Sequence, residues 1–404
     1  MRAPIAIGQQ RSPVYTDAKR PRLVRCTRGR ILKAFFLAGI SALALCACTT
    51  TPGGVTGSYA PVSVATAPSE FRIVPDAEVL ASRPEFKPGG DAKAYVASYL
   101  DWIFTPGHLV ERSVLSDMEP EGLPEGGDFY AMIAELAEEG NPAALLMNAG
   151  DDPAAPQKLA DSGNYVARLV IELDKISVGS IQQKVDALGW FRAEAPRNGD
   201  AGFAFGTFLL TQGGGGDFMG MPSGGAPTPG EVREGAALLF KSAQAAPLDV
   251  SLQAASVLGP HAGVDAEIDT RLRKLLEVVV GATSLTPIPQ PDIEGMTDDQ
   301  AMEAYGAYEL KMSDMMGASV TRVSLASMLQ KGQGGAVDLD RAKLLYREAL
   351  DATQDMQAYT ALGELGVDVS AYDHLFAAPP EGNDGWGEEP EIAPEPPAAP
   401  PHQH

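Results

Sequence analysis

The sequence predicts an all-α protein whose two ends are not helical. Three stretches, at 91–104, 128–140 and 164–175, carry apolar residues at the three- and four-residue spacing of an amphipathic helix. No stretch alternates apolar and polar residues for long enough to indicate a sheet. A pattern of two consecutive helical segments also recurs along the chain, which is typical of a fold built from stacked helix pairs.

The N-terminal 47 residues read as a signal peptide. A basic stretch at 22–33 precedes an apolar run at 34–45, and a run of 12 residues is too short to span a bilayer. Two cysteines follow this run. Cys48, preceded by the small residue Ala47, resembles the lipidated cysteine of bacterial lipoproteins more closely than Cys46 does. We therefore expect lipidation at Cys48; the alternative is an ordinary cleaved signal and a soluble secreted protein.

The segments next to the helical part differ from it in composition. Residues 48–90 are expected to form the lipidated tether and linker, because Thr, Pro, Gly, Ser, Ala and Val dominate their first part and prolines interrupt the rest. Residues 377–404 hold eight prolines and six acidic residues, so a disordered acidic tail is predicted there. Between them, residues 91–160 are either a helical capping region or degenerate repeats, and 161–376 hold the recognisable repeats.

The repeat is clearest at 323–350, where a helical segment, a Gly-rich turn and a second helical segment follow one another. The stretch from 203 to 244 has the same order, with a Gly/Pro/Met insertion at 218–230. The stretch 182–201 matches the second helix only. The second helices of the repeats between these stretches are expected at 271–282 and, with a poorer match, at 301–312.

This pattern resembles the Sel1-like repeat, a relative of the tetratricopeptide repeat with two antiparallel helices per unit. The resemblance implies an α-solenoid in which small residues allow close helix approach, aromatic residues fill the space between repeats, and glycines form the turns. The residues that carry it, all assigned structural roles, are Trp190, Phe191, Gly206, Phe208, Gly213, Gly215, Ala236, Phe240, Gly332, Gly334, Ala342, Tyr346 and Ala349.

Charge and cysteine content exclude several classes of function. The net charge is −22, and removal of residues 1–47, with nine basic and one acidic residue, brings it near −30. Such a chain repels nucleic acids and anionic headgroups, so no nucleic-acid partner is expected. All three cysteines lie at or before Cys48, which leaves the mature body without a thiol nucleophile, a disulfide or a thiolate metal site.

No motif for catalysis, cofactor binding or metal binding is apparent. The glycine run 213–216 lacks the Gly-Lys-Ser/Thr of a phosphate loop, and it lies where the repeat requires a turn. The histidines are not spaced as helical metal ligands, and the adjacent carboxylates Glu138–Glu139 and Asp298–Asp299 do not face each other on a helix. We expect no catalytic residue, no cofactor and no metal.

These observations favour a non-enzymatic adaptor that is anchored to a membrane by its lipid and binds another envelope protein or peptide. Thr49 replaces the Asp that retains lipoproteins at the inner membrane of enteric bacteria, so the outer membrane, facing the periplasm, is the expected location. The alternatives are an envelope-structural protein acting through its Pro-rich tail and, third, an enzyme on a cell-wall-related substrate.

Overall fold

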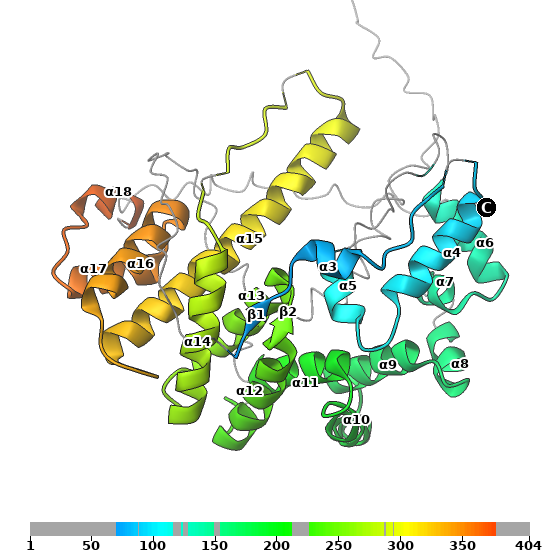
Figure 1. Cartoon of the computed structure of the whole chain (residues 1–404), viewed down its shortest axis with the longest axis horizontal. Coiled ribbons are helices and arrows are strands. Elements are labelled where there is room, and N and C mark those ends of the chain that lie inside the picture. Colours follow the sequence, from blue (N-terminus) through cyan, green and yellow to red (C-terminus); the bar gives the residue numbers. More distant parts are fainter. Residues whose placement is uncertain are drawn as a thin grey trace, which may run out of the picture.

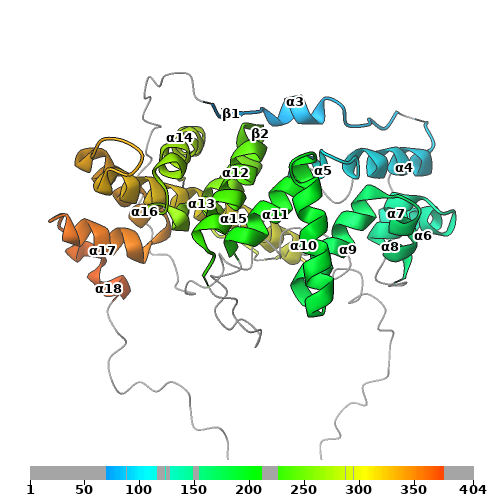
Figure 2. The same cartoon turned by 90° about the horizontal axis from the view of Figure 1, so that it is seen from below.

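The structure is a computed structural model, and it describes residues 70–87, 89–115, 123, 128–148, 154–211, 226–286, 288–293 and 295–376. Within these ranges the chain is predominantly helical, which confirms the all-α prediction. Figure 2 shows the helices from α6 to α12 following one another along the long axis in the order of the sequence, whereas β1 and α5 lie beside elements that come later in the chain.

The N-terminal part of the described chain contains a short strand and mostly short helices. In chain order they are β1 (Arg72–Ile73), α3 (Asp76–Leu80), α4 (Ala92–Ile103), α5 (Leu109–Leu115), α6 (Phe129–Glu138), α7 (Pro142–Met147) and α8 (Ala155–Asp161).

The middle and C-terminal parts contain the longer helices. In chain order they are α9 (Tyr165–Val178), α10 (Ile181–Glu194), α11 (Gly199–Thr211), α12 (Pro229–Ala243), β2 (Ala245–Ala246), α13 (Leu248–Leu258), η2 (Gly259–His261), α14 (Ala266–Ala282), α15 (Asp298–Lys331), α16 (Leu339–Thr353), α17 (Met356–Glu364), η3 (Ser370–Tyr372) and α18 (Asp373–Phe376).

Short polar side chains define where many of these helices begin. Asp91, Asn164 and Asp338 each accept a hydrogen bond from a backbone N–H in the first turn of the helix that follows. Ser180 and Thr228 go further and form reciprocal capping boxes with the third residue of α10 and α12. Each cap satisfies amide groups that have no partner within the helix, and contributes about 1 kcal/mol.

Two large hydrophobic cores lie side by side in the described part of the chain, and α11 contributes to both; a third, small cluster consists of Leu285, Met315 and Ala318. Phe205 and Leu209 pack into the core formed mainly by α4 to α10, whereas Phe203 and Leu210 pack into the core formed by α12 to α17. Helix α11 is therefore buried on nearly all sides, as its almost uninterrupted apolar sequence requires.

The N-terminal segment crosses the stack as a strap, which we define as residues 70–80 (Figure 2). β1 pairs in parallel with β2, with Arg72 opposite Ala245. The ring of Phe71 lies 5.8 Å from that of Phe240, and Arg271 donates to Glu70 over 3.0 Å. Part of the stretch assigned by sequence to the linker is thus packed onto the middle of the helical body.

Helix α15 departs from the predicted repeat. It runs without a break from Asp298 to Lys331, so the stretch 301–312 is the first half of one long helix. The expectation of a separate second helix at 301–312 is wrong, because no turn separates it from the segment at 323 that begins the last repeat. Figure 1 shows the first half of α15 rising away from the other helices.

Candidate functional site

The aromatic residues assigned to the repeats lie in the cores or against them. Phe191 is fully buried and stacks on Phe205, with ring centroids 5.4 Å apart and planes inclined by 13°. Trp190 is half-buried and presents its ring edge-on to Phe191 at 5.0 Å, while its other neighbour is Tyr165 at 6.0 Å. These side chains fill the space between α9, α10 and α11, which is a packing role.

Small residues bring α11 and α12 into close contact. A Cβ atom added to Gly206 would lie 3.0 Å from the carbonyl oxygen of Gly235, so the two backbones approach too closely for a larger residue. Ala236 and Phe240 on α12 are buried in the same core, and Phe208 is half-buried. These small residues therefore lie where α11 and α12 cross.

The turn between α15 and α16 depends on glycine. Gly332 and Gly334 both have φ of +70°, a left-handed conformation that favours glycine. A Cβ atom on Gly334 would come within 2.4 Å of the carbonyl oxygen of Asp269, so this turn is also pressed against α14.

After the turn, α16 packs through the small and aromatic residues that the repeat assigned to it. Ala342, Tyr346 and Ala349 are buried, and the Tyr346 hydroxyl donates to Gln330 Oε1 over 3.1 Å. Cys48, Gly213 and Gly215 lie outside the described residues.

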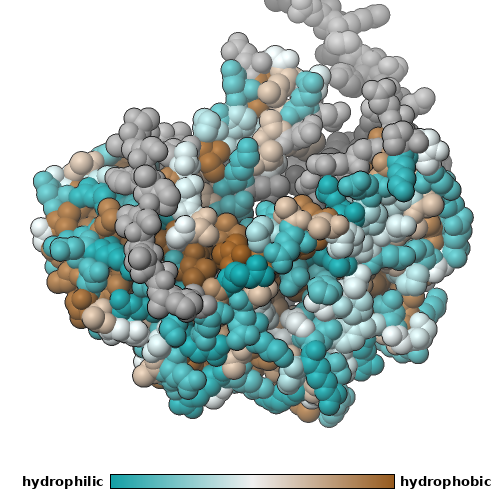
Figure 3. Space-filling view, in the orientation of Figure 1, coloured by the Kyte–Doolittle hydropathy of each residue, from teal (hydrophilic) through white to brown (hydrophobic). Residues whose placement is uncertain are grey.

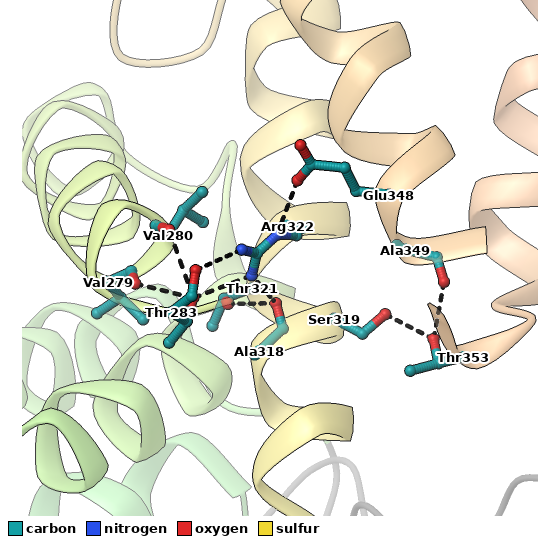
Figure 4. A network of polar contacts seen from close by, with 10 residues as sticks. All are labelled: Val279, Val280, Thr283, Ala318, Ser319, Thr321, Arg322, Glu348, Ala349 and Thr353. Carbon is teal, nitrogen blue, oxygen red and sulfur yellow. Dashed lines mark hydrogen bonds and ion pairs between the residues drawn. The ribbon is translucent and has the colours of Figure 1, made fainter. Parts of the chain in front are cut away.

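A buried polar network joins α14, α15 and α16 (Figure 4). The Arg322 guanidinium donates to Glu348 Oε2 over 2.9 Å, to the Thr283 hydroxyl over 2.9 Å and to the Thr283 carbonyl over 2.7 Å. Thr283 is the C-cap of α14, so Arg322 satisfies the end of that helix. Burial lowers the pKa of Arg322, and the neighbouring Glu348 partly offsets this. Each hydrogen-bond partner of Arg322 belongs to α15, to α16 or to the end of α14, so the network holds these three helices together.

Buried carboxylates elsewhere also hold the backbone in place. Asp200 at the start of α11 accepts from the backbone N–H of Gly107 over 2.6 Å and of Val110 over 3.1 Å, which anchors the loop before α5. Burial raises the pKa of Asp200, and these two hydrogen bonds act in the opposite direction. The Asp200 residue is only 2% exposed, and these hydrogen bonds tie its carboxylate to the backbone that it supports.

Asp249 is a partly buried carboxyl with two other carboxylates near it. Burial raises its pKa to about 6, and repulsion from Asp314 on α15 and Asp76 in the strap adds to this effect. Burial also raises the pKa of Asp314. Negative charge at the base of the first half of α15 is therefore incompletely compensated.

The described ranges contain neither a candidate metal site nor a candidate membrane-spanning helix. They contain no group of three His, Cys, Asp or Glu residues arranged to hold a metal ion. Among their helices, none is both long enough and apolar enough to cross a bilayer.

Among the exposed apolar side chains of the described residues, two groups stand out, and both were missed from the sequence. The first, named the α10 tip, lies where α9 ends and α10 begins and consists of Val178, Ile181 and Val185, of which Ile181 is 85% exposed. The second, the α15 arm, is residues 298–311 together with the loop residues Ile293 and Met296 that precede them. The spacing of Met302, Tyr305, Tyr308 and Met312 could have identified the arm as an amphipathic helix.

The face of the molecule that bears the arm carries both apolar and hydrophilic side chains. In Figure 3 apolar side chains gather where α14 ends and α15 leaves the body, with hydrophilic side chains around them. Such an apolar area with a polar surround is typical of a protein–protein contact surface.

Comparison with known proteins gave no match: no family model, no curated protein and no solved structure is similar to this chain.

Proposed function

We propose that this chain is a non-enzymatic adaptor of the bacterial cell envelope that binds another protein through its helical body. The observation that carries the proposal is the contrast between two well-packed cores and two apolar helical surfaces left exposed, the α10 tip and the α15 arm. Exposed apolar surface on an otherwise closed fold costs solubility, so it is expected to have a partner.

The architecture supports an α-solenoid of Sel1-like helix pairs, of which α11 with α12 and α15 with α16 are the best examples. In both pairs the two helices pack extensively on each other, and the repeat residues lie at the contacts. Stacked pairs present an extended surface, which suits an adaptor better than an enzyme.

The signal sequence supports the location. Lipidation at Cys48 would anchor the chain in a membrane, and the outer membrane, facing the periplasm, is the location we favour. In this proposal residues before Glu70 act as the tether, and the partner is another envelope protein or peptide. A nucleic-acid partner is unfavourable for a chain of net charge −22.

A crosslinking pull-down from intact cells tests the proposal. Wild type and a Cys48→Ala variant are compared, and the intact mass of each purified chain is measured. We expect a lipid mass on the wild type alone and one dominant envelope protein crosslinked to it. An unlipidated wild type would refute the anchor, and a wild type without any enriched partner would refute the adaptor.

The envelope-structural alternative makes a different prediction for the tail. Deleting the residues after Phe376 would abolish function if the Pro-rich segment is the acting part, whereas an adaptor that works through its helical body would keep its crosslinked partner.

A further inference from the structure

The α15 arm does not belong to any hydrophobic core in the described part of the chain. Between Ala301 and Tyr308 no described apolar side chain belongs to a hydrophobic core. Among the described side chains of α15, the first buried one along the helix is Met315. Four turns of helix thus extend beyond the body (Figure 1). An isolated helix of this length is marginally stable in water, so it gains from a second surface.

One side of the arm is apolar. Met302, Tyr305 and Tyr308 follow one another at intervals of three residues, which places them along one face of the helix. Met302 is 46% exposed. Methionine is flexible and polarisable, and tyrosine combines an apolar ring with a polar end, so the face can adapt to the shape of a docked helix.

The same stretch is strongly acidic. Residues 292–314 contain seven carboxylates and a single basic residue, Lys311. At the base of the arm burial and repulsion from Asp314 raise the pKa of Asp249 to about 6, and above that pH the Asp249 carboxylate adds a further negative charge there. A second copy of this chain would bring like charges together, and an anionic membrane surface would be repelled in the same way.

We propose that the α15 arm docks a basic amphipathic helix from another protein. The apolar side of that helix packs on Met302, Tyr305 and Tyr308, and its Lys and Arg side chains face the exposed carboxylates of Glu309 and Asp314. Docking an amphipathic helix on an apolar face is a common mode of peptide recognition, and complementary charge gives it orientation and specificity. The inference rests on the proposed adaptor function and names the chemistry of its partner.

A binding titration with a defined probe tests this inference. The probe is a fluorescein-labelled 18-residue peptide of Leu and Lys arranged as an amphipathic helix, titrated with the purified full chain by fluorescence anisotropy. One control peptide has the same composition in an order without an apolar face, and another carries Glu in place of Lys. We expect only the first peptide to bind, with an affinity that falls as the salt concentration rises.

Paired variants locate the binding surface. Met302→Gln combined with Tyr305→Gln is expected to weaken binding at least tenfold, and Glu309→Lys to weaken it severalfold. The matched control, Ile181→Gln with Val185→Gln on the α10 tip, is expected to change the affinity less than twofold. Because all these side chains lie at the surface or half-buried outside the cores, circular dichroism should show the same helix content in every variant.

The opposite results overturn the inference. It fails if the arm variants bind as wild type does, if the α10-tip variant loses binding equally, or if the Glu peptide binds as well. It also fails if sedimentation shows a dimer that only the arm variant loses, since the occupant would then be a second copy. An arm variant that still captures its envelope partner from cells refutes the arm while leaving the adaptor function intact.

Discussion

Replacement of Arg322 by methionine tests how the last three long helices are held together. Arg322 and Glu348 are nearly inaccessible, with side chains 5% and 9% exposed, and their ion pair spans 2.9 Å. Methionine fills a similar volume without the charge, so Arg322→Met leaves the Glu348 carboxylate buried without a counter-ion and removes the donors that satisfy Thr283.

The expected loss follows from the cost of an unpaired buried charge. Breaking a buried pair by removing one partner lowers the free energy of unfolding by about 3–5 kcal/mol. Replacing both partners by apolar residues removes the charge as well, and is often close to neutral. We therefore expect the double variant, Arg322→Met with Glu348→Met, to be more stable than Arg322→Met alone by about 2 kcal/mol or more.

Equilibrium unfolding in urea, followed by circular dichroism, measures these differences. With a slope of about 3 kcal/mol per molar urea, the single variant should unfold at a midpoint lower by about 1 M or more. The control is Arg192→Met, which removes the ion pair to Glu234 at the surface and should cost under about 1 kcal/mol. The reasoning is refuted if the single and double variants unfold at the same midpoint, or if the single variant unfolds like the control.

Three further substitutions have outcomes that the structure specifies. Gly334→Ala should destabilise the fold by about 2 kcal/mol, because φ is +70° and the new Cβ would meet the Asp269 carbonyl oxygen; a thermal melt measures it. Asp249→Asn should stabilise the chain more at pH 8 than at pH 4. The pKa of Asp249 in the folded protein is about 6, above its ordinary value, so the stability that its protonated form provides is fully present below pH ~4 and is lost as the pH rises through 6. Phe71→Ala should cost about 3 kcal/mol of packing against Phe240 and accelerate tryptic cleavage at the strap.

Each of these expectations has a contrary result. An unchanged melting temperature for Gly334→Ala would mean that the turn adjusts freely. An equal gain in stability at both pH values for Asp249→Asn would mean that the effect does not depend on ionisation of the Asp249 carboxyl. An unchanged cleavage rate for Phe71→Ala would mean that the strap is held by its backbone pairing alone.

Local signals made much of the helical part predictable. Asp91, Asn164 and Asp338 stand directly before apolar residues at helical spacing, and each is an N-cap in the structure. Phe191 and Tyr346 were recognised as repeat aromatics and are buried. These features depend on residues within a few positions of one another, which is the range over which sequence patterns are informative.

The strap and the arm depend on contacts that sequence patterns do not report. Glu70 pairs with Arg271, about two hundred positions away, and two-residue strands are too short to show any alternation. The repeat period predicts a helix break within 298–331, but α15 is continuous there. The stretch 298–331 contains no proline, and Gly306 and Gly317 sit inside the helix without ending it.

The position of the strap determines where mechanical load enters the molecule. The described chain begins at Glu70, and β1 joins the stack beside β2, α12 and α14, at its middle rather than at α4. Tension applied to the preceding residues would first act on the ladder between Arg72 and Ala245 and on the contact of Phe71 with Phe240. If Cys48 is the point of attachment to a membrane, the helical body is held near its middle, and both of its ends are free to turn toward a partner.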